Sequence, residues 1–260
     1  MEKARRPVAF FDSGLGGISV LRETRKQLPC EQYLYFGDSA NAPYGTKSPA
    51  EVRRLSRAVM ERMLEMGAKA VVIACNTATG MAIDLLREEY GELPIIGVEP
   101  AVKPAAEMYS GGRILVLATP LCLRGQRFQE LWKRFSAQAE IVPIPCEGLM
   151  EFVERGELEG PALRAYLREK LAPWRGKRVD AAVLGCTHYP FLRAAIAEAL
   201  GNGAEIIDGN AGIAAQLRRR LEERGLLNPG PEDGVVTFYN SLRDPAILEL
   251  SRMLFALPDT

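Results

Sequence analysis

The sequence predicts an α/β fold made of two similar α/β domains with mainly parallel sheets. Short apolar runs alternate with helical patterns along the chain, which is typical of parallel sheets whose strands are joined by helices. One stretch also occurs twice, because AVVIACNT at 70–77 is answered by AAVLGCTH at 181–188. Two halves, each holding one copy of this stretch, are the simplest interpretation.

The repeated stretch predicts a buried strand that ends at a cysteine. Each copy is a run of aliphatic residues, followed by a small residue, a cysteine and residues able to open a helix. In open α/β sheets, ligands bind beyond the carboxyl ends of the strands. Cys75 and Cys186 are therefore expected at the end of the sheet where substrates bind and react. We expect the two copies to face each other across an active site in the cleft between the domains.

In the first part of the chain, the apolar runs before each turn predict strands. These are 8–11, 33–36, the run that leads to Cys75, and 95–98. Apolar residues at helical spacing predict helices over 18–25, 49–66 and 79–90. Ser48 and Pro49 suit the N-cap and first residue of the second helix, and Gly67 suits its end.

From Glu99-Pro100 the pattern starts again. Strands are predicted at 114–118, 141–143, the run that leads to Cys186, 206–208 and 235–239, and helices at 102–109, 124–135, 161–171, 191–200, 217–224 and 245–255. Asn210 is predicted as an N-cap.

The composition excludes several classes of protein. Lys plus Arg and Asp plus Glu both number 33, which argues against a nucleic-acid or membrane-surface partner. No apolar run approaches the ~20 residues that cross a bilayer, and no signal-peptide core is present, so a cytoplasmic location is expected. The five cysteines lack C-x-x-C spacing and His188 is the only histidine, so neither a disulfide framework nor a metal site is predicted.

The turn after the first strand reads DSGLGG over 12–17. Its glycines allow close approach of backbone to ligand, and the N–H groups at the start of the next helix can bind a carboxylate. The dinucleotide fingerprint would need glycine where Ser19 stands, and no Gly-Lys-Ser/Thr follows for a phosphate loop. An ordinary tight turn is the alternative interpretation.

Two cysteines on either side of one small molecule predict proton transfer at carbon. Inverting a carbon requires a group on each face that serves as both acid and base. Cysteine suits this role because its reference pKa of ~8.5 keeps thiol and thiolate close in energy. Asp12 and His188 are placed to assist the two sulfurs. No cofactor signature is visible, although a pyridoxal lysine remains an open alternative.

Several motifs, in order and over most of the chain, resemble those of the glutamate racemases of the aspartate/glutamate racemase superfamily. They are DSGLGG at 12–17, PYG at 43–45, ACNTAT at 74–79, GVEP at 97–100 and LGCTHYP at 184–190. The resemblance implies a cofactor-independent racemase that interconverts L- and D-glutamate for peptidoglycan synthesis, acting as a homodimer.

The resemblance also implies residue roles. Cys75 and Cys186 are the acid/base pair, each serving one enantiomer, and Asp12 and His188 assist them. The implied substrate-binding residues are Asp12, Ser13, Pro43, Tyr44, Gly45, Asn76, Thr77, Thr119, Thr187 and His188. Glu154 resembles an acidic residue near the family's site. No metal or cofactor is implied.

The resemblance further implies a discontinuous first domain, residues 1–98 plus 207–260, and a second domain of 99–206. One departure stands out, because the family's Thr-x-x-Thr reads Thr119 to Cys122 here. A thiol is a weak hydrogen bonder, which puts a substrate contact at that point in doubt.

Other interpretations stay open. A racemase of the same superfamily acting on aspartate or a hydantoin would share these motifs. A hydrolase using Cys186 and His188 would leave Cys75 idle, and some members of the family bind DNA gyrase instead. Cys30, Cys122 and Cys146 are expected to act as small hydrophobic residues.

Overall fold

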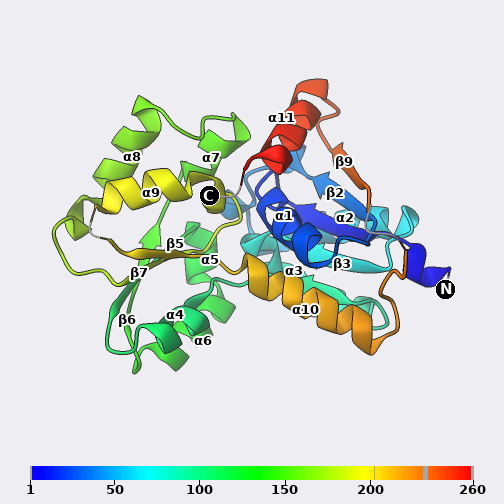
Figure 1. The fold of residues 1–260 in the computed structure, drawn as a ribbon, viewed down its shortest axis with the longest axis horizontal. Helices are drawn as coiled ribbons and strands as arrows, with labels where there is room; N and C mark the ends of the chain where they lie inside the picture. The colour runs from blue at the N-terminus through cyan, green and yellow to red at the C-terminus, as the bar shows by residue number, and fades with distance from the viewer. Residues whose placement is uncertain (1, 202, 231–233, 259–260) are drawn as a thin grey trace. The chain divides into compact units, whose positions relative to one another are not determined.

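A computed structural model describes residues 2–201, 203–230 and 234–258, and it divides the chain into two units. The first unit holds the residues up to Val98 and Asn210–Leu257, and the second holds Glu99–Gly209 together with Pro258. In Figure 1 the first unit is blue to cyan and orange to red, and the second is green to yellow. The chain returns to the first unit later than residue 207, because Ile207 belongs to a strand of the second unit's sheet.

The first unit is built on a five-stranded sheet in the order β4-β3-β1-β2-β9, with every neighbouring pair parallel. Its strands are β1 (Val8–Asp12), β2 (Tyr33–Gly37), β3 (Ala70–Ile73), β4 (Ile95–Gly97) and β9 (Val236–Asn240). Its α-helices are α1 (Ile18–Gln27), α2 (Pro49–Glu65), α3 (Asn76–Glu89), α10 (Asn210–Glu223) and α11 (Pro245–Ala256), with 3-10 turns at Lys3–Arg5, Ser39–Asn41 and Tyr44–Thr46. Helix α1 packs against α10 and α11, whereas α2 packs against α3.

The second unit has a four-stranded parallel sheet in the order β6-β5-β7-β8. Its strands are β5 (Arg113–Ala118), β6 (Glu140–Pro145), β7 (Ala181–Leu184) and β8 (Glu205–Ile207). Its α-helices are α4 (Val102–Met108), α5 (Pro120–Arg124), α6 (Gln126–Phe135), α7 (Leu149–Glu154), α8 (Pro161–Leu171) and α9 (Arg193–Leu200), with 3-10 turns at Ala172–Trp174 and Tyr189–Leu192. Figure 1 shows α7, α8 and α9 on one side of this sheet and α4 and α6 on the other.

The two sheets share one topology, which confirms the predicted pair of similar, parallel α/β halves. From the same end, the strand orders are β4-β3-β1-β2 and β8-β7-β5-β6. In each unit the chain moves outward from its first strand and then returns past that strand to a third. The second strand of each unit therefore lies on one side of the first strand, and the third lies on the other side. The direction in which strands are added to the sheet changes between β1 and β3, and between β5 and β7. A crevice for ligands opens at the carboxyl ends of strands at such a switch point.

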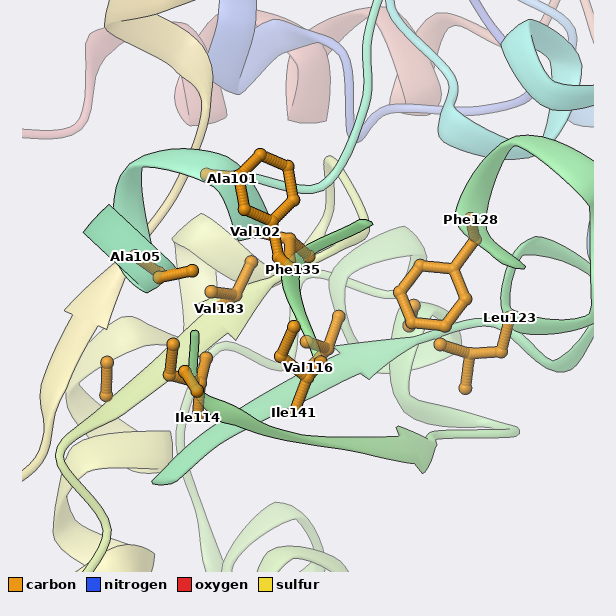
Figure 2. Close-up of a cluster of buried hydrophobic side chains, with 14 of the residues drawn as sticks. Ala101, Val102, Ala105, Ile114, Val116, Leu123, Phe128, Phe135, Ile141 and Val183 are labelled. Atoms are coloured by element: carbon orange, nitrogen blue, oxygen red, sulfur yellow. The ribbon is translucent and has the colours of Figure 1, made fainter. Parts of the chain in front are cut away.

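Burial explains why these strands form the centre of each unit. All five residues of β1 are buried, as a central parallel strand covered on both faces requires. In β5, Ile114 and Val116 point into a cluster with Phe128 and Phe135 of α6 and Ile141 of β6. Figure 2 shows these side chains between the sheet and its helices.

The helix boundaries confirm some predictions and correct others. Ser48 caps α2, its hydroxyl accepting the N–H of Glu51 at 3.2 Å, and Pro49 is the first helical residue. The predicted helix over 124–135 is two helices, because Gly125 is extended between α5 and α6. The predicted helix over 217–224 begins at Asn210, which is helical rather than a cap.

Helix α3 also begins earlier than predicted, at Asn76 instead of 79, because the Cys75 side chain caps it. Within the described ranges, no helix combines the length and the apolar character that a bilayer crossing needs.

Candidate active site

Cys75 lies directly beyond β3 at the switch point of the first unit. It is the N-cap of α3, and its sulfur accepts the N–H of Ala78 at 3.4 Å. Only 6% of the residue is exposed. The positive end of a helix favours negative charge on a capping group, so this position suits a thiolate.

Asp12 is the last residue of β1, the other strand of the same switch point, and Ser13 follows it directly. The thiol of Cys75 donates to the Ser13 hydroxyl at 3.5 Å, and that hydroxyl is 3.4 Å from Oδ1 of Asp12. The N–H of Gly14 holds the same Asp12 oxygen at 2.8 Å. The structure thus brings Cys75, Ser13 and Asp12 into one hydrogen-bonded group, with Asp12 fully buried.

Tyr44 approaches this group from the loop after β2. Its hydroxyl donates to Oδ2 of Asp38 at 2.7 Å, and its ring packs edge-on against Phe11. Burial and the Asp38 carboxylate raise the pKa of Tyr44, with smaller contributions from Cys75 and Asp12. The phenol therefore stays neutral and can donate a hydrogen bond.

Pro43 and Gly45 flank Tyr44 in the same loop, and the Ala42–Pro43 peptide is cis. Both are half-buried. The loop is held by Asn41, whose amide donates to both carboxylate oxygens of Asp38, at 3.0 and 3.1 Å.

Asn76 and Thr77 open α3 immediately after Cys75. Thr77 is buried, whereas Asn76 is partly exposed. The amide oxygen of Asn76 is buried and has no hydrogen-bond partner in the described part of the chain. Because an unpaired buried acceptor costs about 1–3 kcal/mol, this oxygen is suited to accept from a bound ligand.

In the second unit, Cys186 lies beyond β7 and forms a chain of contacts with His188 and Glu154. The sulfur is 3.6 Å from Nδ1 of His188, and Nε2 of the same ring is 2.7 Å from Oε1 of Glu154. Burial works against protonation of His188, but the hydrogen bonds to Cys186 and Glu154 outweigh it and raise its pKa well above the ordinary value. His188 can therefore hold a proton within reach of the Cys186 sulfur.

The remaining predicted residues of this unit lie at the same edge of its sheet. Thr119 follows β5, and its hydroxyl accepts the N–H of Cys122 as the cap of α5. Thr187 is buried between Cys186 and His188. Cys122, the departure from the family pattern, belongs to the buried hydrophobic cluster.

The other cysteines are free thiols with packing roles. Cys146 is buried, and desolvation raises its pKa to about 12. Its carbonyl accepts the hydroxyl of Tyr189 at 3.0 Å. Cys30 is half-buried at the opposite end of the first unit's strands, just before β2.

The predicted residues thus form two groups, one at the switch point of each unit. Sequence reasoning left Asp38 without a role, although it directly follows β2, and it gave Glu154 only a loose likeness. No sequence motif around Glu154 indicates its contact with His188, because the two residues are 34 positions apart in the sequence. No cluster of three or more metal-binding side chains occurs among residues 2–201, 203–230 and 234–258.

Known proteins with similar sequences decide the family. A model of the Asp/Glu/hydantoin racemases matches residues 18–217. The chain belongs to the Asp/Glu/hydantoin racemase family. As a member it is an enzyme, and the racemase resemblance of the sequence motifs is confirmed.

Individual relatives of this racemase family cover nearly the whole chain. A glutamate racemase of Clostridium perfringens is 47% identical over 251 residues, 96% of each chain. A glutamate racemase of Clostridium acetobutylicum is 47% identical over 257 residues, 99% of this chain and 100% of that one.

Solved structures of the family have the same fold. Glutamate racemase of Francisella tularensis, in complex with D-glutamate, gives a TM-score of 0.84 at 28% identity, covering 98% of this chain and 95% of that chain. The Escherichia coli enzyme, in complex with L-glutamate and an activator, also gives 0.84, at 30% identity over 96% of this chain and 95% of that one.

Proposed function

We propose that this enzyme interconverts L- and D-glutamate by a two-base mechanism in which Cys75 and Cys186 are the acid/base pair. The relatives that match nearly the full chain at 47% identity are named glutamate racemases. The solved structures with D- and L-glutamate bound support glutamate as the small-molecule substrate.

The observation that carries the mechanism is the matched position of the two cysteines. Each follows the third strand of its sheet, beside the switch point, and each sulfur has a hydrogen-bond partner of its own. The sulfur of Cys75 bonds to Ser13, whose hydroxyl in turn contacts Asp12. The sulfur of Cys186 contacts His188, whose ring in turn bonds to Glu154. The repetition supports two equivalent proton-transfer groups.

Protons balance in this scheme. The thiolate of one cysteine removes the Cα proton and becomes a thiol, while the thiol of the other delivers a proton to the opposite face and becomes a thiolate. The product is the other enantiomer, and the reverse reaction exchanges the two roles. Asp12 and His188 hold or exchange protons with the sulfurs. The scheme uses no cofactor and no metal.

The other predicted residues bind the substrate. The free amide oxygen of Asn76 suits the substrate ammonium, and the start of α3 at Asn76 and Thr77 suits a carboxylate. Tyr44, kept neutral, suits hydrogen bonding at the loop that also contains Pro43 and Gly45. Ser13, Thr119 and Thr187 supply hydroxyl groups.

Isotope exchange tests this proposal. We expect the purified enzyme, incubated with L-glutamate in D2O without pyridoxal phosphate, to produce D-glutamate that contains deuterium at Cα. Activity should survive EDTA. If racemisation requires added pyridoxal phosphate, or if D-glutamate forms with the original proton retained, the two-cysteine mechanism is wrong.

Substrate range distinguishes glutamate from the other substrates of the family. L-aspartate and hydantoins should be converted at least ~100-fold less efficiently than glutamate, because one missing methylene misplaces the side-chain carboxylate and leaves polar groups of the site unpaired. A preference for aspartate would overturn the assignment while leaving the proton chemistry intact.

One observation favours a second candidate, because Cys186, His188 and Glu154 also have the order of a nucleophile, base and orienting acid. A thiol hydrolase of this kind would not need Cys75. Full activity of a Cys75→Ser variant on an amide or ester substrate would support it.

The biological role and the assembly follow from the same proposal. The D-glutamate produced would supply peptidoglycan synthesis in the cytoplasm, for cell-wall biogenesis and cell shape. Cells depleted of the enzyme should then resume growth when D-glutamate is supplied. We also propose a homodimer, which sedimentation analysis of the full chain would test.

A further inference from the structure

The loop that leads into α7 is held by two tyrosine hydroxyl groups. The hydroxyl of Tyr189 donates to the carbonyl of Cys146 at 3.0 Å, and the hydroxyl of Tyr166 donates to the carbonyl of Glu147 at 2.7 Å. The two carbonyls are neighbours in one loop, whereas the tyrosines come from different elements, the 3-10 turn that follows His188 and helix α8. Two separate parts of the second unit therefore hold the same short segment.

Tyr189 connects this loop to the turn that contains Cys186. The residue is 0% exposed, and burial raises the pKa of its phenol well above the ordinary value, so the hydroxyl keeps its proton. A buried hydroxyl needs a partner within the protein, and the Cys146 carbonyl is that partner. The backbone N–H of Tyr189 donates to the carbonyl of Cys186 at 3.0 Å. One residue thus bonds to both segments.

Helix α7 depends on such contacts for its position. It has six residues and no side-chain N-cap, and it follows Gly148, whose φ of 79° is left-handed. A helix this short is not stable by itself in water. Leu149 and Val153 anchor one face of it in the core, but apolar contacts have no preferred direction. The hydrogen bonds to the loop before α7 therefore determine where the helix begins.

The position of α7 decides whether Glu154 meets His188. Glu154 is the last residue of α7, about 7.5 Å along the helix axis from its first residue. Its Oε1 lies 2.7 Å from Nε2 of His188, so a shift of about 1 Å in the helix would take the two atoms out of hydrogen-bonding range. His188 directly precedes Tyr189 in the chain. Both partners of this contact are therefore connected to Tyr189.

We propose that Tyr189 and Tyr166 are positioning residues, which hold α7 so that Glu154 bonds to His188. Their hydroxyl groups act through the backbone of the loop before α7. The proposal rests on the proposed racemase mechanism, because the contact that the tyrosines maintain serves the proton-transfer group of Cys186.

The charged surroundings of His188 give the direction of the expected effect. Cys186 on its own turn and Glu154 on α7 face the ring, and the hydrogen bonds to both raise its pKa. A looser contact with Glu154 therefore lowers the pKa of His188. Other titratable groups surround Tyr189 instead, namely Cys146, Glu151 and Tyr166.

NMR of the untagged full chain tests the proposal, because His188 is the only histidine in the sequence. Histidine labelled with 15N gives the imidazole signals of this one residue, and their titration measures its pKa. In Tyr189→Phe, which removes one hydroxyl and keeps the ring, we expect the pKa of His188 to fall toward the value measured in Glu154→Gln.

Tyr33→Phe is the matched control. Tyr33 is 1% exposed, and its hydroxyl donates to the carbonyl of Leu28 at 2.6 Å, so this variant also loses one buried hydrogen bond to the backbone. It stands at the start of β2, at the opposite end of the strand from the switch point. Its His188 signals and its kcat should match the wild type. Equal changes in Tyr33→Phe and Tyr189→Phe would mean general loosening and would refute the positioning role.

Steady-state kinetics give the second readout. Tyr189→Phe should lower kcat about tenfold or more and change KM for glutamate less than about twofold, because it displaces a proton-transfer group and leaves the substrate contacts in place. Tyr166→Phe should act in the same direction but more weakly, since Tyr166 is only half-buried.

The outcomes separate this proposal from the proposed reaction. Unchanged His188 signals and unchanged kcat in Tyr189→Phe, beside an inactive Cys186→Ala, would overturn the positioning role and leave the racemase mechanism intact. Full activity of Cys186→Ala would overturn the mechanism, whatever the His188 signals show. If Tyr189→Phe does not fold, wild-type signals and kcat in Tyr166→Phe overturn the positioning role instead.

Discussion

Nε2 of His188 lies 2.7 Å from Oε1 of Glu154, although the two residues are 34 positions apart in the sequence. The opposite nitrogen of the same ring faces the sulfur of Cys186. Glu154 therefore fixes which edge of the imidazole points at the sulfur, and it stabilises positive charge on a ring that is only 2% exposed.

This relationship predicts a pH-dependent contribution to stability. The pKa of His188 is raised above its unfolded value of about 6.5. A raised histidine pKa means that the stabilisation is complete below pH ~6.5 and is lost as pH rises through the folded-state pKa. Glu154→Gln should therefore destabilise the protein most near pH 6, by about 1–3 kcal/mol, and progressively less toward pH 9.

Thermal or urea unfolding of the wild type and Glu154→Gln at several pH values measures this difference. Glu249→Gln, which changes an exposed carboxylate on α11, is the control and should show no trend. A difference for Glu154→Gln that is constant, or that grows with pH, would contradict the protonated His188.

Because Cys75 and Cys186 occupy equivalent positions in their units, we expect substitution of either one to lower racemase activity to a similar extent. Cys75→Ala and Cys186→Ala should each lower racemisation in both directions by roughly 10²–10⁴-fold, because each removes one acid/base group. Cys30→Ala, at a half-buried cysteine near neither group, should retain activity. Polarimetry or circular dichroism of glutamate follows the reaction. Undiminished activity of either active-site variant would refute the paired role.

Asn76 should affect substrate binding without affecting stability. Its amide oxygen has no partner in the described structure, so Asn76→Ala removes little from the fold and should change the free energy of unfolding by less than ~0.5 kcal/mol. The KM for glutamate should rise about tenfold or more, because the variant loses a hydrogen bond to charged substrate. Steady-state kinetics and urea unfolding measure the two quantities.

Thr79, one turn further along α3, supplies the opposite control. Its hydroxyl donates to the carbonyl of Ile73 and accepts the N–H of Val98, both at 3.1 Å. Thr79→Val should cost about 1–3 kcal/mol of stability and leave KM unchanged. If Asn76→Ala proves the more destabilising of the two, Asn76 is structural.

A buried ion pair away from the cysteines predicts a large effect on stability. Lys69, whose side chain is 0% exposed, pairs with Glu31 and also donates to the carbonyl of Ala4. Lys69→Met should cost about 3–5 kcal/mol, because it leaves a buried carboxylate unpaired. The double variant with Glu31→Gln should recover part of that loss. Urea unfolding that shows simple additivity would contradict this coupling.

The sequence was informative about the strands because parallel strands carry their signal locally. The apolar runs at 8–11, 33–36 and 114–118 all lie in strands of the structure, since a strand covered on both faces needs little else to identify it. Helix starts were less predictable. Helix α3 begins at Asn76 because the sulfur of Cys75 serves as its N-cap. Cysteine is not among the preferred N-cap residues, so the sequence did not indicate this helix start.

By itself, the sequence determined that this chain has two parallel α/β halves and that Cys75 and Cys186 end equivalent strands. Those properties depend on hydrophobic pattern and chain order, which are local. Only the tertiary structure decided that Glu154 holds His188, that Asp38 holds Tyr44, and that Tyr189 holds the carbonyl of Cys146. These side chains come from different elements, and their contacts exist only once helices have packed on the sheet that brings the elements together.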